Sequence, residues 1–259
     1  GEWILSELKA LTEMLQPRTT YLAAEEGCVN GCCELRTPPR TGHPARTGAG
    51  LDKLLTLASL RTERVVLGGG EPFLRRDIQA LLQQGLVLQM HGIWFYPTAR
   101  PLASGQPLME ALWEALKDSL KRDVCRGIVA PLFSHEAKAH DKRALVEGAL
   151  LQARAGMIRW KKAGGSVHAW LHLDQENISS LAEWVSWLAD HGVSAASFLF
   201  GSSPSGWGGT PWADLPSMAA AGRAIRAVRS RAEKLGVSVS CFGIPECVLP
   251  DDKVPNAES

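Results

Sequence analysis

The stretch Leu67-Gly68-Gly69-Gly70-Glu71-Pro72 decides the fold of this chain. It continues the apolar run Val65-Val66, which marks a buried β-strand that is expected to end here. Three consecutive glycines leave the backbone open to a ligand, and a proline cannot continue the hydrogen-bond ladder of a strand. The stretch therefore predicts a ligand-binding loop at the carboxyl end of a strand.

A second loop, upstream of the glycines, carries the cluster Cys28-Val29-Asn30-Gly31-Cys32-Cys33. It follows another strand-like segment, Thr20-Tyr21-Leu22-Ala23. Half of the 6 cysteines lie in this cluster, unlike the spread framework of a small secreted domain. In a reducing compartment such clustered thiols favour a metal, so we expect a metal site in this loop.

Strand-like and helical segments alternate along the chain. An opening helix is expected over 2–16, and apolar residues at three- and four-residue steps predict helices over 145–163 and 178–190. Strands are expected at 20–23, 65–67, 86–88, 128–130, 167–171, 196–200 and 237–240. Glycines that stop helices before the next strand are expected at Gly164-Gly165, Gly192 and Gly236.

This alternation implies parallel strands joined by right-handed crossovers. It predicts an α/β fold, most simply a partial (β/α) barrel of six to seven parallel strands, with a full barrel or a doubly wound open sheet as alternatives. In each topology functional residues gather at the carboxyl ends of the strands. The cysteine loop and the glycine stretch both fall on that edge.

Composition sets the remaining frame. A chain of 259 residues with 45% hydrophobic content can bury one large core, and we expect a single domain over 1–250 with a frayed polar tail over 251–259. The net charge of +1 gives no field that would attract nucleic acid or a membrane surface. Neither a long apolar run nor a signal-peptide pattern is present, so we expect a cytoplasmic protein.

The order of strand, cysteine loop, helix and strand ending in Gly-Gly-Glu-Pro resembles the radical S-adenosylmethionine superfamily. Within it, the chain is most similar to peptide-modifying enzymes, especially the C-type maturase of the His-Xaa-Ser system. That similarity rests on Pro38-Pro39, Gly69-Gly70-Glu71-Pro72, Ala130-Pro131-Leu132-Phe133 with His140-Asp141, Leu171 to Asn177, and Ile244-Pro245-Glu246-Cys247.

The resemblance implies both cofactors and a reaction. Cys28 and Cys32 match the first two ligands of a [4Fe-4S] cluster that binds S-adenosylmethionine. The segment that meets the methionyl amine of this cofactor matches Gly68, Gly69, Gly70, Glu71 and Pro72. An electron from the cluster would cleave S-adenosylmethionine to methionine and a 5′-deoxyadenosyl radical, which abstracts hydrogen from a substrate. The implied substrate is a peptide or small protein.

The chain departs from the family at the third cysteine, where Leu35 stands. Cys33 in an irregular loop, or Cys241 or Cys247 from the end of the last strand, could replace the missing ligand. Alternatively the cluster is lost, and the fold serves as a binding or scaffold protein. A third hypothesis is a zinc site that includes His43, although adjacent cysteines fit the paired spacing of zinc ligands poorly.

Further candidates follow other strands. His135, His140 and Asp141 lie past the fourth strand, where related proteins place groups near the ribose or the substrate, although a hydrogen-bonded loop histidine is the simpler interpretation of His135. His172 and Asp174 end the fifth strand, where a structural role is again the simpler interpretation.

The resemblance also implies Thr-Asn-Gly after the third strand, where this chain has Met90-His91-Gly92. In the glycine-rich segment 201–216, Trp207 and Trp212 are candidates for holding a peptide. A basic loop could line the same groove with Arg36, Arg40 and Arg46. By contrast, Cys125 is expected to be a small buried hydrophobe.

Overall fold

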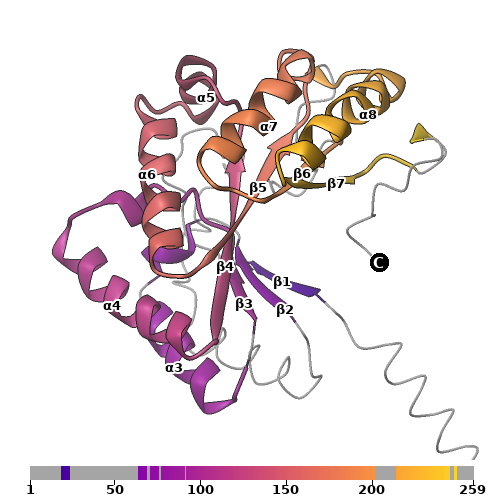
Figure 1. Ribbon diagram of the computed structural model, residues 1–259. Helices are drawn as coiled ribbons and strands as arrows, with labels where there is room; N and C mark the ends of the chain where they lie inside the picture. The colour runs from indigo at the N-terminus through magenta and orange to yellow at the C-terminus, as the bar shows by residue number, and fades with distance from the viewer. Residues whose placement is uncertain are drawn as a thin grey trace, which may run out of the picture.

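A seven-stranded parallel sheet forms the frame of the protein. The computed structural model describes residues 19–23, 64–68, 71–75, 77–90, 92–201, 214–245 and 248–249. The strands are β1 (Thr19–Ala23), β2 (Arg64–Gly68), β3 (Ile93–Phe95), β4 (Cys125–Leu132), β5 (Ser166–His172), β6 (Ala195–Leu199) and β7 (Ser238–Phe242). Each strand pairs in parallel with the one before it in the chain. This order curves the sheet into a partial barrel (Figure 1).

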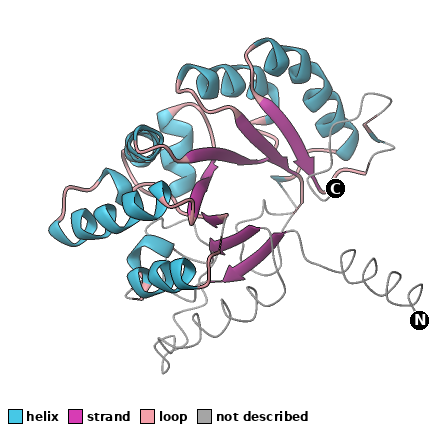
Figure 2. Ribbon diagram, turned by 60° about the horizontal axis from the view of Figure 1, so that its bottom comes forward, coloured by secondary structure: helices cyan, strands magenta, loops and turns pink. Residues whose placement is uncertain are grey.

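Helices connect the strands and lie along the outer side of the curved sheet (Figure 2). They are α3 (Ile78–Val87), α4 (Pro107–Lys121), α5 (Ala137–Ala144), α6 (Ala149–Lys162), α7 (Leu181–Asp190) and α8 (Met218–Lys234), with the short 3₁₀ helices η1 (Pro72–Leu74), η2 (Pro101–Ala103) and η3 (Ile178–Ser180). The predicted partial (β/α) barrel is thereby confirmed.

The apolar core lies between the sheet and these helices. Successive residues of a strand point to opposite faces, and the residues in register at Leu171, Phe198 and Cys241 all belong to the core. Phe198 contacts Trp184 of α7 with ring centroids 5.6 Å apart, which places this face against the helices. The alternate residues of the same strands therefore point to the concave face of the sheet.

The third strand was predicted in the wrong place. Residues 86–88 are the end of α3 and its C-cap, and the strand is Ile93–Phe95 instead. Leu86 and Leu88 pack partly against the core, whereas Val87 is 75% exposed. A short apolar run at the end of an amphipathic helix resembles a strand in the sequence, which explains the error.

The helix predicted over 145–163 is confirmed as α6, although it begins later than predicted, at Ala149. Leu145 ends α5 in a left-handed conformation with φ of 54°, and Gly148 precedes α6 with φ of 72°. The helix predicted over 178–190 begins as η3 and continues as α7. The predicted helix ends are confirmed, since Gly164, Gly192 and Gly236 all have positive φ just after a helix.

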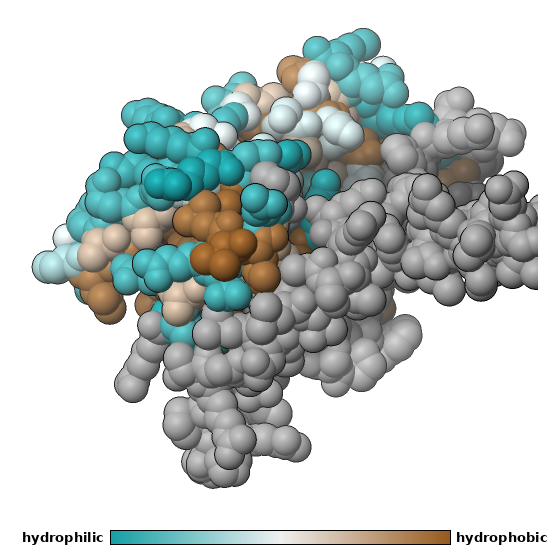
Figure 3. All heavy atoms as spheres, turned by 90° about the horizontal axis from the view of Figure 1, so that it is seen from below, coloured by the Kyte–Doolittle hydropathy of each residue, from teal (hydrophilic) through white to brown (hydrophobic). Residues whose placement is uncertain are grey.

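The described surface is mainly hydrophilic when it is seen from below, with some apolar side chains gathered in its middle (Figure 3). The large apolar residues with the highest exposure, Leu108 at 82% and Val87 at 75%, belong to different helices. Single exposed residues of this kind do not define an interface. Within the described ranges, every helix is too short or too polar to cross a membrane.

Close packing at the concave face yields a stability prediction. Trp94 of β3 lies opposite Gly127 of β4, and a Cβ at Gly127 would overlap the indole ring. We expect Gly127→Ala to lower the free energy of unfolding by about 1–3 kcal/mol, because the ring has to move. Urea titration would measure this. The matched control is Gly105→Ala, whose Cβ would meet nothing within 4 Å and should change stability by less than about 0.5 kcal/mol.

Candidate functional site

The loops that follow β1 and β2 begin side by side. The two strands are parallel, and their last residues, Ala23 and Gly68, are register partners. The cysteine loop and the glycine stretch therefore leave the same edge of the barrel from neighbouring strands. Cys28, Cys32, Cys33, Gly69 and Gly70 lie outside the described residues. Their role in binding an iron–sulfur cluster and S-adenosylmethionine stays a prediction.

Glu71 and Pro72, within the described part of the stretch, begin a 3₁₀ turn. The Glu71 side chain is fully buried, and its Oε1 accepts a hydrogen bond of 3.4 Å from the backbone amide of Phe73. Its Oε2 accepts bonds from both the backbone amide (2.8 Å) and the hydroxyl (2.7 Å) of Thr98. Glu71 thus joins the loop after β2 to the loop after β3.

Thr98 was not predicted from the sequence, because the third strand was expected at 86–88, too early in the chain. Met90-His91-Gly92 lies before β3 rather than after it, and the residues that follow the strand are 96–99. Ala99 has φ of 61°, a left-handed conformation that glycine adopts more easily than alanine. The sequence resemblance had placed the loop after the third strand at Met90-His91-Gly92, six residues or more before Thr98.

Aromatic side chains cross the concave face near its carboxyl edge. Tyr96, just after β3, meets Trp170 of β5 with ring centroids 5.2 Å apart. Trp170 in turn meets Phe242 of β7 at 5.6 Å. These rings form an aromatic row between strands that are far apart in the sheet order. Each of these rings lies next to a core residue along the chain. This alternation of core and concave-face residues is visible in the sequence and could have identified the row.

A hydrogen-bonded polar chain lies beside the aromatic row. His168 Nε2 of β5 is 2.8 Å from Ser197 Oγ of β6, which is 2.7 Å from Ser240 Oγ of β7. Burial lowers the pKa of His168 to about 4, with a smaller contribution from the charge of Arg64. The imidazole is therefore neutral near pH 7, and its polar contacts are satisfied within the barrel.

His172 ends β5 at the same edge. It is 7% exposed, and its Nδ1 has no hydrogen-bond partner among the described residues. Burial lowers the pKa of His172 to about 4, and the charge of Arg143 lowers it further in the same direction. A buried neutral imidazole without a partner is the kind of group that a ligand or an ordered water completes.

Asp174 organises the turn after His172. Its Oδ2 forms an ion pair of 2.8 Å with Arg143, and its Oδ1 accepts hydrogen bonds from the amides of Glu176 (2.9 Å) and Asn177 (2.7 Å). The Asn177 side chain donates to the carbonyl of His172 at 2.7 Å. Asp174 therefore shapes the rim of the barrel through structural contacts.

The candidates after β4 also have local roles. His140 Nδ1 accepts a bond of 3.1 Å from the amide of Phe133, and burial lowers the pKa of His140 to about 4. Asp141 accepts bonds from the amides of Gly148 (2.6 Å) and Leu150 (2.9 Å), where α6 begins. Both side chains hold the connection between β4 and α6. His135 is different, since its buried Nδ1 has no partner within the described ranges.

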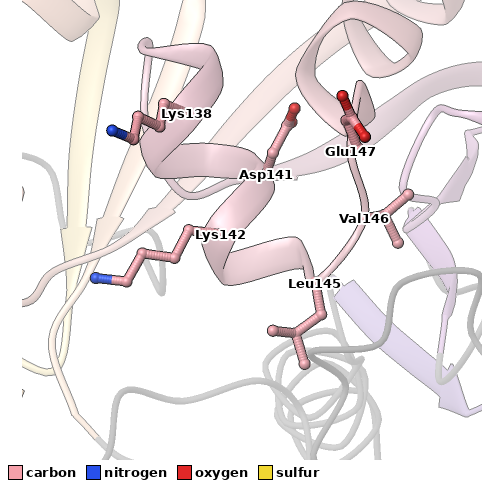
Figure 4. A pocket seen from close by; sticks show the side chains of 6 residues that line it. All are labelled: Lys138, Asp141, Lys142, Leu145, Val146 and Glu147. Atoms are coloured by element: carbon pink, nitrogen blue, oxygen red, sulfur yellow. The ribbon is translucent and has the colours of Figure 1, made fainter.

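An open pocket of about 600 Å³ lies beside α5 (Figure 4). It is lined by Lys138, Asp141, Lys142, Leu145, Val146 and Glu147. The two lysines point the same way, whereas Asp141 points to the other side of the helix. Both Asp141 oxygens already accept backbone hydrogen bonds. Asp141 therefore has a structural role here, and the described residues of the pocket contain no group of metal ligands.

The two cysteines in the described ranges are buried and free. Cys125 is 1% exposed at the start of β4, which confirms its expected role as a small core residue. Cys241 is fully buried on the face that packs against the helices, and burial raises the pKa of its thiol. A metal ligand must be a thiolate and must reach the mouth of the barrel. This position therefore argues against Cys241 as the third cluster ligand, and Cys247 lies outside the described residues.

These elements define a partial (β/α) barrel whose loops converge at one edge, and solved structures share this architecture. SuiB of Streptococcus suis bound to S-adenosylmethionine matches with a TM-score of 0.67 and 16% identity, over 87% of this chain and 50% of SuiB. SuiB bound to its precursor peptide SuiA matches with a TM-score of 0.68 and 16% identity, over 92% and 52% of the two chains.

The chain thus spans about half the length of the SuiB structures. At this level of identity the similarity establishes the fold. No protein-family model matches the sequence, and no curated protein matches it.

The buried histidines predict acid sensitivity. The pKa of His140, His168 and His172 is lowered from 6.5 to about 4, so the folded state binds fewer protons than the unfolded state between these values. Their stabilising contribution is complete above pH 6.5 and is lost as the pH falls toward 4. We expect a slope of up to about 1.4 kcal/mol per pH unit for each histidine in urea titrations from pH 7 to 5. His168→Gln should flatten that slope, and an unchanged slope would contradict the prediction.

The unpartnered nitrogen gives a paired prediction. We expect His172→Leu to raise the free energy of unfolding by about 1 kcal/mol, because it removes a buried polar atom that lacks a partner. His140→Leu is the matched control and should lower stability by about 1–3 kcal/mol, since it strands the amide of Phe133. Thermal and urea unfolding at pH 7.5 would measure both. Equal destabilisation by the two substitutions would show that the His172 nitrogen is not orphaned.

Proposed function

We propose that this chain is a radical S-adenosylmethionine enzyme that carries a [4Fe-4S] cluster and modifies a peptide or small protein in the cytoplasm. The observation that supports this most strongly is the register of β1 with β2. This register places the start of the loop that carries three clustered thiols beside the end of β2, where the three glycines begin. The barrel that carries both loops has the fold of SuiB, which has been solved with S-adenosylmethionine and with a precursor peptide.

The donor set fits an iron–sulfur cluster. Cys28 and Cys32 would be its first two ligands, and Cys33 or Cys247 would be the third, because thiolates are the usual ligands of iron–sulfur clusters. The backbone of Gly69 and Gly70 would approach the methionyl amine of S-adenosylmethionine. When bound, the two cofactors supply one-electron cleavage of S-adenosylmethionine and hydrogen abstraction from the substrate.

The residues on the concave face would prepare the site for this chemistry. The aromatic row of Tyr96, Trp170 and Phe242 presents apolar surface that keeps water from a reactive intermediate. His172 offers a neutral imidazole nitrogen for a hydrogen bond with a bound molecule. Glu71 fixes the end of the glycine stretch through Thr98.

A peptide substrate is the finer part of the proposal. SuiB bound to its precursor peptide SuiA supports it, because the match to that structure covers 92% of this chain. Trp207 and Trp212, together with Arg36, Arg40 and Arg46, would line the groove for an extended peptide. These residues lie outside the described ranges, so their part rests on the sequence alone.

Anaerobic reconstitution with iron and sulfide tests the proposal. We expect the purified protein to take up a [4Fe-4S] cluster, detected by iron analysis and electron paramagnetic resonance, and to cleave S-adenosylmethionine when reduced. Cys28→Ala and Cys32→Ala should abolish the cluster because each removes a ligand. Cys125→Ala is the matched control and should retain it, since Cys125 is buried in the core.

Two further variants locate the third ligand. Loss of the cluster in Cys33→Ala assigns it to the cysteine loop, whereas loss only in Cys247→Ala assigns it to the segment after β7. Wild-type protein that never takes up iron would refute the enzyme and favour the binding or scaffold protein, for which Leu35 at the third cysteine position is the supporting observation.

A further inference from the structure

The junction between Glu71 and Thr98 is a buried, hydrogen-bonded contact between two loops. Glu71 has no exposed surface, and burying a carboxylate is costly unless hydrogen bonds compensate for lost water. Thr98 contributes two short bonds to a single carboxylate oxygen, at 2.8 Å from its amide and 2.7 Å from its hydroxyl. The position of Glu71 therefore depends on where the loop after β3 holds Thr98.

That loop is held in an uncommon conformation. Ala99, the next residue, has φ of 61° and is fully buried. A left-handed backbone is unfavourable for a residue with a Cβ and persists only when the surroundings enforce it. The strained residue Ala99 thus lies next to Thr98, which contacts Glu71 across 27 positions of the chain.

Helix α6 supplies the contacts that enforce this conformation. Gly156 allows the Ala99 carbonyl to lie directly against the helix, because a Cβ at Gly156 would overlap that oxygen. Gln152 accepts a bond of 2.9 Å from Arg100, and Arg159 donates to the carbonyl of Leu102 at 3.1 Å. The loop is thus fastened to α6 on one side and to Glu71 on the other.

We propose that Thr98 is a positioning residue that, through Glu71, fixes the end of the glycine stretch where it enters η1. Its effect on S-adenosylmethionine rests on the proposed function, whereas its effect on the stretch itself does not. The amides of η1 report directly on how that end is held. Phe73 donates to the Glu71 carboxylate, and Leu74 donates to the Glu71 carbonyl at 3.1 Å.

Thr98→Val is the decisive variant, because it removes the hydroxyl bond while it keeps the backbone amide and the side-chain shape. We expect hydrogen exchange at the amides of Phe73, Leu74 and Arg75 to accelerate about tenfold in the cofactor-free protein. In reconstituted protein, we expect calorimetry to show S-adenosylmethionine affinity reduced by about tenfold. Thr98→Ser keeps the hydroxyl and should restore both values.

The matched control is Ser119→Ala. Ser119 is 2% exposed and donates to the carbonyl of Ala115 at 2.9 Å within α4, so this variant also loses a buried hydroxyl bond. It should leave exchange at η1 and cofactor affinity within about twofold of wild type. Gly156→Ala provides a second route, since it displaces the Ala99 carbonyl, and should accelerate the same η1 amides.

Hydrogen exchange and cofactor affinity together distinguish failure of the positioning role from failure of the proposed function. Unchanged exchange at η1 in Thr98→Val, or equal changes in Thr98→Val and Ser119→Ala, would overturn the positioning role. Faster exchange at η1 with wild-type cofactor affinity would also overturn it, because the contact would then be merely structural. Wild-type protein that holds the cluster yet binds no S-adenosylmethionine refutes the proposed function, while exchange at η1 still decides whether Thr98 holds the stretch.

Discussion

Parallel pairing in chain order is the constraint on which the site depends. Each strand pairs with its predecessor, so each crossover returns the chain to the amino end of the sheet and every strand ends at the same edge. Ala23 and Gly68 are register partners, and the amide of Tyr96 donates to the carbonyl of Leu67 at 2.8 Å. The loops after β1, β2 and β3 therefore begin at neighbouring points of one edge.

The two faces of the sheet differ in the residues they contain and in what they contact. The outer face is apolar and packs against helices, with Phe198 on Trp184 as one contact. The concave face contains polar and aromatic groups, and within the barrel they satisfy one another through His168, Ser197 and Ser240. At the carboxyl edge His172 keeps a buried nitrogen without a partner in the described ranges. A bound molecule or an ordered water can complete this nitrogen.

The sequence predicted the fold because its strong signals are local. The strands at β1, β2, β4, β5, β6 and β7 are apolar runs that end near loops, and glycines mark the ends of α6, α7 and α8. The third strand failed because residues 86–88 match a short strand as well as they match a helix end. The helix predicted over 145–163 begins only at Ala149, because Leu145 and Gly148 adopt a left-handed backbone before it.

The candidate site was predictable only where a sequence motif indicates a function. The glycine stretch and the cysteine loop were found from their composition, whereas the bond between Glu71 and Thr98 joins residues 27 positions apart and required the correct third strand. The core-facing position of Cys241 was available in principle, since Ser240 and Phe242 alternate with it along β7. The unpartnered state of His172 could not be inferred, because it depends on which groups from other strands fail to reach it.

Ala99 illustrates how a helix on the outer side of the sheet can support a loop at its carboxyl edge. Its φ of 61° is left-handed, a conformation that costs an alanine about 1–2 kcal/mol. The contacts that Gly156, Gln152 and Arg159 make with this loop can offset that cost. Helix α6 thereby stabilises the loop that holds Glu71, although it lies on the outer side of the sheet. The geometry at the mouth of the barrel is consequently set as much by a crossover helix as by the strands that open into it.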